Sequence, residues 1–236
     1  GGHGNVNLNK AMIVSSNTFF FSLAYKSDIN KLIEHLSKFG FGTKVCADCF
    51  NPDKALLPNP EWKMNNLNFG WFKGDTVNLG VGQGYLSATP LQLAYYSTVL
   101  ANKGTSRELS FIHEKHDIKN LNIQLNNTDD LDWKRLHQSM IGVIESPIGT
   151  AKRLQELKTY TVAAKSGTVE LVSTDTKEDY KIIRENEGNR DHAIIIAFGP
   201  MPNPKYAVSV VIENGESGGS VAGPVAIEVL NSLIGK

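Results

Sequence analysis

Four consecutive residues late in the chain, Lys165-Ser166-Gly167-Thr168, place a cation, two hydroxyls and a glycine inside a run that otherwise resembles a β-strand. Strand interiors favour β-branched and aromatic residues, and a glycine there usually marks the close approach of a ligand or another backbone. Lysine on an exposed edge strand is also a common guard against aggregation. The run is therefore either a protected sheet edge or one wall of a binding site.

A second polar cluster, Ser15-Ser16-Asn17, interrupts an apolar stretch near the start of the chain. Apolar spacing predicts a short helix over residues 8–14 and another over residues 18–25, so the cluster is expected where two helices meet. Serine and asparagine commonly cap helices, and capping is the simplest interpretation of this cluster taken alone.

The elements that must position these clusters change character along the chain. Helical spacing continues through much of the first part, over residues 29–36, 90–103, 133–144 and 149–157. Thr89 and Pro90 supply a cap and a first residue for the second of these helices. Residues 41–84 are rich in Gly, Pro and Asn and predict a long irregular excursion, a kind of segment that is usually functional or mobile. Residues 105–132 show no strong period.

The later part of the chain has the spacing of strands. Residues 160–172, 192–198 and 206–212 are β-like, and a turn-forming linker between the last two predicts an antiparallel hairpin. Pro224 opens a closing helix. This order predicts a mixed α/β (α+β) fold in which helices pack on an antiparallel sheet.

Composition excludes several classes of protein. The chain has 236 residues, and its 24 basic and 24 acidic residues cancel, so nothing suggests a nucleic-acid or membrane-surface partner. Its longest apolar run, residues 193–198, is far shorter than a membrane span, and no signal peptide opens the chain. A soluble globular piece is expected.

The two cysteines, Cys46 and Cys49, form a single Cys-x-x-Cys pair. Without a second pair or a histidine at ligand spacing, a zinc ribbon is not expected. The pair is either structural or incidental, or it forms an exposed disulfide.

The two polar clusters together resemble the S-x-N and K-[ST]-G motifs of penicillin-binding proteins and serine β-lactamases. Their flanks resemble, in order, the transpeptidase domain of the penicillin-binding protein 2 family, the class B enzymes that crosslink peptidoglycan during cell elongation. The segments that carry this resemblance are "GHGNVNL", "NTFFFSLAY", "FGFG", "LLPNPEWK", "GDTVNLGVGQGY", "TPLQLA", "GTA", "RDHA" and "GGSVAGPVA".

The resemblance implies a transpeptidase or serine β-lactamase-like fold and an acyl transfer from a D-Ala-D-Ala stem peptide to an amine. It assigns catalytic roles to Ser15 as a proton relay, to Lys165 as the positive charge that donates to Ser15, and to Asn17 as the group that orients the substrate amide. We therefore expect Ser15 and Lys165 to lie within hydrogen-bond reach, at roughly 3 Å.

The same resemblance makes the strand around Gly167 a substrate-binding wall. Gly167 would let the substrate backbone lie against the strand, and Thr168 would give its backbone N–H to an oxyanion hole. The hydroxyls of Ser166 and Thr168 would bind the terminal carboxylate. No cofactor is expected.

One family signature is missing, because no serine lies three residues before any lysine. Residues 1–236 are therefore expected to be the C-terminal portion of a single transpeptidase domain, helical over about 1–158 and carrying the sheet strands and closing helix over about 159–236. This portion alone should be inactive.

The resemblance also implies location and partners. The family acts at the periplasmic face of the bacterial inner membrane, with its anchor outside this chain. It acts on stem peptides, is the target of β-lactam antibiotics, and works with a membrane glycosyltransferase and elongation scaffold proteins.

Some family members hold zinc through the histidine of a G-H-G motif and a cysteine in the middle of the S-x-[DN] motif. His3 matches the first position, but Ser16 stands at the second and is a poor zinc ligand. No metal site is predicted.

Two alternatives come from other functional classes. A serine β-lactamase or D,D-carboxypeptidase shares the motifs but uses water as the acceptor. A non-catalytic penicillin-binding-like module would agree with the missing nucleophile.

Overall fold

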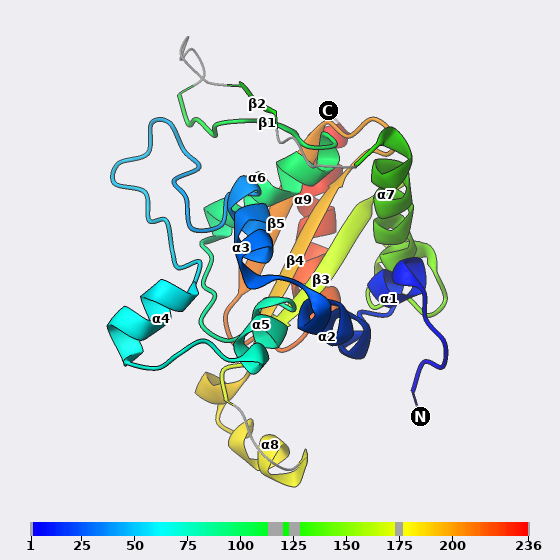
Figure 1. Ribbon diagram of the computed structural model, residues 1–236. Coiled ribbons are helices and arrows are strands. Elements are labelled where there is room, and N and C mark those ends of the chain that lie inside the picture. The colour runs from blue at the N-terminus through cyan, green and yellow to red at the C-terminus, as the bar shows by residue number, and fades with distance from the viewer. Residues whose placement is uncertain (1, 113–119, 123–127, 173–176, 236) are drawn as a thin grey trace. The chain divides into compact units, whose positions relative to one another are not determined.

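The computed structural model describes residues 2–112, 120–122, 128–172 and 177–235 (Figure 1). Its contacts divide the chain into two compact units. One consists of Gly1–Ala11 with Ser16–Asp130, and the other of Met12–Ser15 with Leu131–Lys236.

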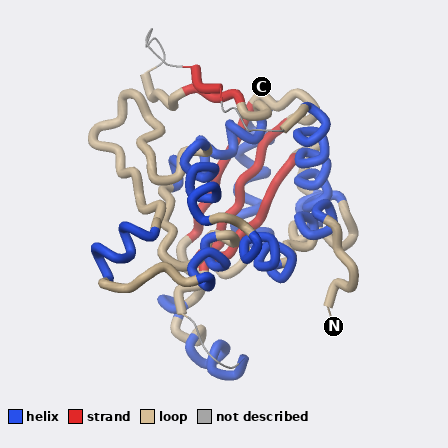
Figure 2. Tube along the Cα trace, in the orientation of Figure 1, coloured by secondary structure: helices blue, strands red, loops and turns tan. Residues whose placement is uncertain are grey.

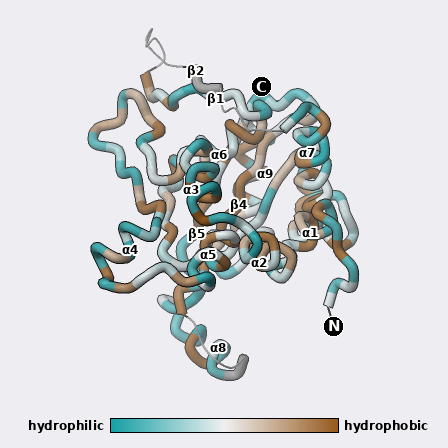
Figure 3. The backbone as a smooth tube through the Cα atoms, viewed as in Figure 1, coloured by the Kyte–Doolittle hydropathy of each residue, from teal (hydrophilic) through white to brown (hydrophobic). Residues whose placement is uncertain are grey.

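The unit that contains residues 131–236 is built on a three-stranded antiparallel sheet, drawn red in Figure 2. Its strands are β3 (Ala163–Val169), β4 (His192–Gly199) and β5 (Tyr206–Ile212), in the order β3-β4-β5. The central strand β4 is almost wholly apolar and mostly buried, and it is brown in Figure 3. The predicted strands and their antiparallel pairing are confirmed.

One face of the sheet packs against the closing helix α9 (Gly223–Ile234), which lies behind the strands in Figure 1. Ala226, Ile227 and Leu230 of α9 join Ile195 of β4 in a hydrophobic core cluster of this unit. Because Pro224 stands in the first turn of α9, where its missing N–H costs no hydrogen bond, it starts the helix as predicted.

Helical turns complete this unit. Helix α7 (Asp130–Glu145) buries Trp133, Met140, Val143 and Ile144, and the His137 ring lies edge-on to Phe198 of β4 with centroids 5.3 Å apart. Shorter elements are a 3₁₀-helix at Lys152–Glu156, α8 (Lys177–Ile183), a 3₁₀-turn at Glu187–Asn189 and a π-helical turn at Gly218–Ala222.

The other unit is mainly helical. Its elements are α2 (Asn17–Lys26), α3 (Ile29–Lys38), α4 (Pro60–Leu67), α5 (Lys73–Leu79), α6 (Pro90–Ala101) and the paired strands β1 (Thr105–Arg107) and β2 (Asn120–Asn122). Helix α1 (Leu8–Ile13) spans the boundary between the two units. Thr89 and Gln92 form a capping box at the start of α6, as the Thr-Pro signal predicts. The buried Gln92 side chain also donates to the carbonyls of Gly40, Thr43 and Lys54, so α6 anchors the preceding loops.

Two predictions about local structure are wrong. The excursion over residues 41–84 contains α4 and α5, which are two short helices started by local caps: Asn59 accepts from Trp62 N, and Asp75 accepts from Phe72 N. Residues 149–157 form a 3₁₀-helix over Lys152–Glu156 and not an α-helix. Such segments are too short for apolar spacing to reveal them.

Cys46 and Cys49 form a disulfide, which was expected to be exposed if it formed, but Cys46 is buried and Cys49 is half-buried. Beside them, Asp48 accepts from the backbone N–H groups of Phe111 and Ile112, both at 3.0 Å. Among the described helices, none is both long and apolar enough to cross a bilayer.

Candidate active site

Ser15 lies in the turn after α1 and has a left-handed backbone, with φ of 52°. A residue with a Cβ rarely adopts this conformation, which costs about 1–3 kcal/mol and occurs preferentially at functional sites. The segment is held in place from both sides. Ile13 packs against Gly142 of α7, where an added Cβ would lie 2.7 Å from Ile13 Cδ1, and Ile13 O accepts from Thr150 N at 3.3 Å.

Lys165 of β3 is brought to Ser15 from 150 positions along the chain. Its ammonium Nζ donates to Ser15 Oγ at 2.8 Å and to Ser166 O at 2.8 Å. Both residues belong to the same compact unit. The predicted contact between the two side chains is confirmed.

The environment of Lys165 changes its acid strength. Burial lowers the pKa of its ammonium from 10.5 to about 8, because removal from water penalises the charged form. An ammonium has three N–H donors, and the described residues accept two of them. The third N–H of this ammonium, whose pKa is about 8, has no acceptor among the described residues.

Successive side chains along a strand project from opposite faces of the sheet. The side chains of Ser166 and Thr168 therefore project from the face opposite to that of Lys165. Ser166 Oγ lies 2.8 Å from Thr150 Oγ1, and Thr168 Oγ1 donates to Glu216 O at 3.4 Å. In the described sheet β3 is an edge strand, so groups from both faces border the same open edge.

Packing among the described residues does not require a glycine at position 167. An added Cβ would meet Ile194 Cβ at 3.7 Å, which is an ordinary contact. The neighbouring Gly218 is different, since a Cβ there would lie 2.1 Å from Ile194 O and 2.5 Å from Gly167 O. Packing therefore requires a glycine at 218, whereas the described residues leave room for a side chain at 167.

Asn17 is the first residue of α2, is exposed, and belongs to the other unit, with Ser16 and the residues up to Asp130. Its predicted role stays a prediction. Ser16 holds the N-cap position of α2 but makes no side-chain capping hydrogen bond, while the Ser15 hydroxyl accepts from Lys165. Capping thus does not account for the two serines.

Thr150 is a neighbour of the site that the sequence analysis missed. Its hydroxyl contacts Ser166, its N–H donates to Ile13 O, and its carbonyl would lie 2.5 Å from a Cβ on Gly219. Thr150 lies within the segment Gly149-Thr150-Ala151, and no local pattern in that segment indicates that the Thr150 hydroxyl contacts β3.

One cluster of metal-ligand side chains is found within the described ranges, formed by Cys46, Asp48 and Cys49. The disulfide between the two cysteines removes the thiolates that zinc would need. His3 is exposed and is not part of this cluster.

The fold is thus a mixed α/β one, in which a lysine on the edge strand of an antiparallel sheet donates to a serine in the turn after α1. Residues 1–231 match the family model of the penicillin binding protein transpeptidase domain, and the chain belongs to this family.

Similar proteins agree with this assignment. The chain is 35% identical over 229 residues to peptidoglycan D,D-transpeptidase MrdA of Acinetobacter baumannii, which covers 94% of this chain and 34% of that protein. The MrdA protein of Haemophilus influenzae is 34% identical over 237 residues, covering 98% and 36%. The chain thus spans about a third of the length of these curated relatives.

Solved structures show the same fold. Pseudomonas aeruginosa PBP2 in complex with WCK 5153 superposes with a TM-score of 0.84 at 36% identity, covering 97% of this chain and 49% of that one. Helicobacter pylori PBP2, in its complex with MreC, gives a TM-score of 0.85 at 32% identity, covering 99% and 41%.

Proposed function

We propose that residues 1–236 are the C-terminal portion of the single transpeptidase domain of a peptidoglycan D,D-transpeptidase that crosslinks stem peptides in cell-wall elongation. In this proposal the helical part extends over about 1–158 and the strands and closing helix over about 159–236. The observation that carries the proposal is the 2.8 Å hydrogen bond between Lys165 Nζ and Ser15 Oγ, within a chain of this family.

The reaction is an acyl transfer in two steps. A serine hydroxyl of the whole protein gives its proton to the lysine of its Ser-x-x-Lys motif and attacks the carbonyl carbon between the two D-Ala residues. The C–N bond breaks, and the terminal D-Ala takes a proton and leaves as an amine. The nucleophile lies outside these residues, because none of their lysines follows a serine at Ser-x-x-Lys spacing. An amine of a neighbouring stem peptide then attacks the ester and regenerates the serine.

Ser15 moves the proton in the first step. Its hydroxyl accepts from Lys165 and can donate its own proton to the departing nitrogen. Lys165 then returns a proton to Ser15, which a group with a pKa near 8 can do at physiological pH. Asn17 orients the substrate amide through its own amide group.

The edge of β3 binds the substrate. The stem peptide adds to β3 as a further strand, and Gly167 leaves room for its backbone. The third N–H of Lys165 and the hydroxyls of Ser166 and Thr168 bind the terminal carboxylate, and Thr168 N–H supplies half of the oxyanion hole. β-Lactam antibiotics bind the same edge.

For location and partners we propose those of the family. The whole protein acts at the periplasmic face of the bacterial inner membrane, together with a membrane glycosyltransferase and elongation scaffold proteins. The complex of H. pylori PBP2 with MreC, a relative at 32% identity, supports an assembly of this kind.

Product analysis tests the proposed function. The full-length protein is incubated with a D-Ala-D-Ala stem-peptide donor and an amine acceptor, and the products are separated by mass. We expect release of D-Ala together with a crosslinked product. Release of D-Ala without crosslinks would identify a carboxypeptidase, and no release at all would indicate a non-catalytic module.

A further inference from the structure

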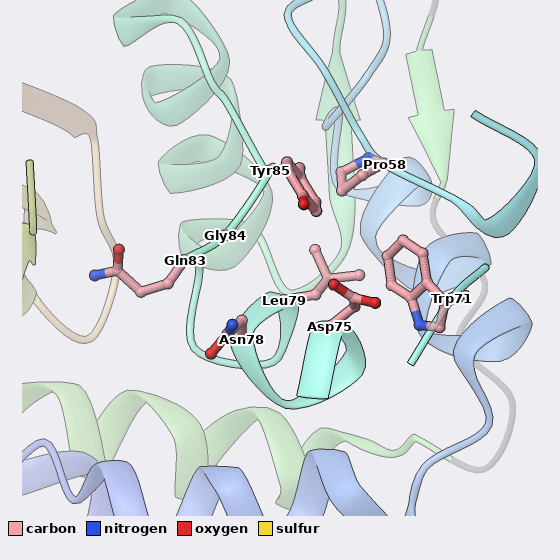
Figure 4. A pocket seen from close by; sticks show the side chains of 8 residues that line it. All are labelled: Pro58, Trp71, Asp75, Asn78, Leu79, Gln83, Gly84 and Tyr85. Carbon is pink, nitrogen blue, oxygen red and sulfur yellow. The ribbon is translucent and has the colours of Figure 1, made fainter. Parts of the chain in front are cut away.

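A pocket of about 260 Å³ lies within the unit that contains Ser16–Asp130 and shares no residue with the Ser15–Lys165 pair. This volume is slightly below the range of about 300–1,000 Å³ that holds drug-sized ligands, so it suits one small ring or group. The lining residues, shown in Figure 4, are Pro58, Trp71, Asp75, Asn78, Leu79, Gln83, Gly84 and Tyr85.

Two aromatic rings form the walls of this pocket. In Figure 4, Tyr85, Pro58 and Trp71 surround a common space with Leu79 and Asp75, whereas Gln83 points away from it. Trp71 Nε1 donates to Thr76 Oγ1 at 2.9 Å, which fixes the indole and uses its only polar group. Tyr85 is 42% exposed. The rings therefore offer held aromatic faces at an accessible site.

The negative charge of Asp75 in the pocket is neutralised by an ion pair with Lys63. Lys63 Nζ lies 2.6 Å from Asp75 Oδ2, and the two side chains are 5% and 14% exposed. The same ammonium lies over the rings of Phe72 and Tyr85, at 4.8 and 5.6 Å from their centroids. A ligand cation would have to compete with Lys63 for the Asp75 carboxylate and for the aromatic rings. An anion would be repelled by Asp75, so the pocket favours a neutral ligand.

A neutral ligand still finds polar groups there. Asp75 Oδ2 already accepts from Lys63 Nζ and from Phe72 N at 2.7 Å. Within the part of the chain that the structure describes, no hydrogen bond ends on Asp75 Oδ1. This oxygen can accept from a hydroxyl or amide of the ligand, and the exposed Asn78 amide can donate and accept.

We infer that this pocket binds one sugar ring of a glycan strand. The faces of a pyranose carry C–H groups, which are attracted to the negative faces of aromatic rings, while its rim carries hydroxyl and N-acetyl groups that need donors and acceptors. The rings of Trp71 and Tyr85 suit the C–H faces of the sugar, and the polar groups of Asp75 and Asn78 suit its hydroxyl and N-acetyl groups. The inference rests on the proposed function, because peptidoglycan is a polymer of such sugars joined to stem peptides.

The test measures binding of chitotetraose, a neutral tetramer of N-acetylglucosamine without any peptide, to the full-length protein by isothermal titration calorimetry. We expect weak, saturable binding, and about tenfold or greater loss of affinity in Tyr85→Ala and in Trp71→Ala. Tyr85→Phe keeps the ring and should bind nearly as the parental protein does. Trp71→Ala also removes the hydrogen bond from the indole to the buried Thr76. If Trp71→Ala melts at a lower temperature than the parental protein, the affinity of Tyr85→Ala decides the test.

Phe69→Ala is the matched control, because Phe69 is an aromatic residue 63% exposed that does not line the pocket, and it should leave affinity unchanged. A parental protein that is acylated by penicillin but does not bind chitotetraose would overturn this inference alone. Parental affinity in Tyr85→Ala, or displacement of the sugar by tetramethylammonium, would overturn it too. A parental protein that penicillin does not acylate would remove the proposed function and this inference with it.

Discussion

At the scale of single residues, Lys165 combines a charge with a low affinity for its proton. Burial weakens its hold on the proton, and two acceptors, Ser15 Oγ and Ser166 O, keep the ammonium in one position. A lysine that only guarded a sheet edge would extend into water and would keep an ordinary pKa. The geometry therefore favours the binding-site interpretation over the protected-edge interpretation.

Replacement of Lys165 by alanine in the full-length protein should lower the second-order rate of acylation by a fluorescent penicillin by about 10²-fold or more. The substitution removes both the charge for the carboxylate and the proton donor to Ser15. Stopped-flow fluorescence measures the rate, and a thermal melt excludes unfolding. A variant that melts normally and acylates at the parental rate would contradict the assigned role.

The same rate should fall as pH rises through about 8. Since the pKa of Lys165 is lowered to about 8, the ammonium is present below that pH and is lost above it. The arginine of Lys165→Arg stays charged at every pH used. We therefore expect this variant to be acylated more slowly than the parental protein, but its rate should not fall as pH rises through about 8. An unchanged alkaline limb in the arginine variant would assign that titration to another group.

At the scale of secondary-structure elements, the sequence predicted those that depend on strong local signals. Strands β4 and β5 have β-branched and apolar runs, and α6 has a Thr-Pro start. The short helices α4 and α5 were missed because each has only about two turns, and capping decides them more than apolar spacing does.

For the candidate site, the motif resemblance predicted the pairing of Ser15 with Lys165 but not its supports. The left-handed backbone of Ser15 and the contact of Thr150 with Ser166 depend on segments far apart in the chain. Local residue patterns carry no information about such contacts. The aromatic pocket was missed as well, because Pro58 and the residues between 71 and 85 that line it lie on or around helix α5, which the sequence did not predict.

The two glycines at β3 predict opposite outcomes on substitution. Gly218→Ala would place a Cβ 2.1 Å from Ile194 O and should destabilise the protein by about 1–3 kcal/mol or more, lowering the Tm by about 5 °C. Gly167→Ala should melt close to the parental temperature yet acylate more slowly, because its methyl group occupies the space kept for the substrate backbone. Differential scanning calorimetry and penicillin acylation separate the two effects. Equal acylation in Gly167→Ala and the parental protein would show that the space serves no ligand.

At the scale of the whole molecule, residues 1–236 contain the residues of the proposed relay and binding wall but no Ser-x-x-Lys sequence. We predict that a protein made of these residues alone forms no stable acyl adduct with penicillin, because Ser15 is held by Lys165 to pass protons and not to attack. Intact-mass spectrometry after incubation with excess β-lactam tests this. A stoichiometric mass increase would show that the nucleophile lies within these residues.

The contact between Ser15 and Lys165 also has a consequence for the order of events during synthesis. Met12–Ser15 belongs to a compact unit whose remaining residues begin at Leu131, so this short segment leaves the ribosome long before its packing partners exist. Closing a loop of 150 residues costs entropy that only the finished sheet can offset. The contact between Ser15 and Lys165 is therefore made late, after β3 has emerged and paired, and a nascent chain that has not yet reached β3 lacks the proposed relay.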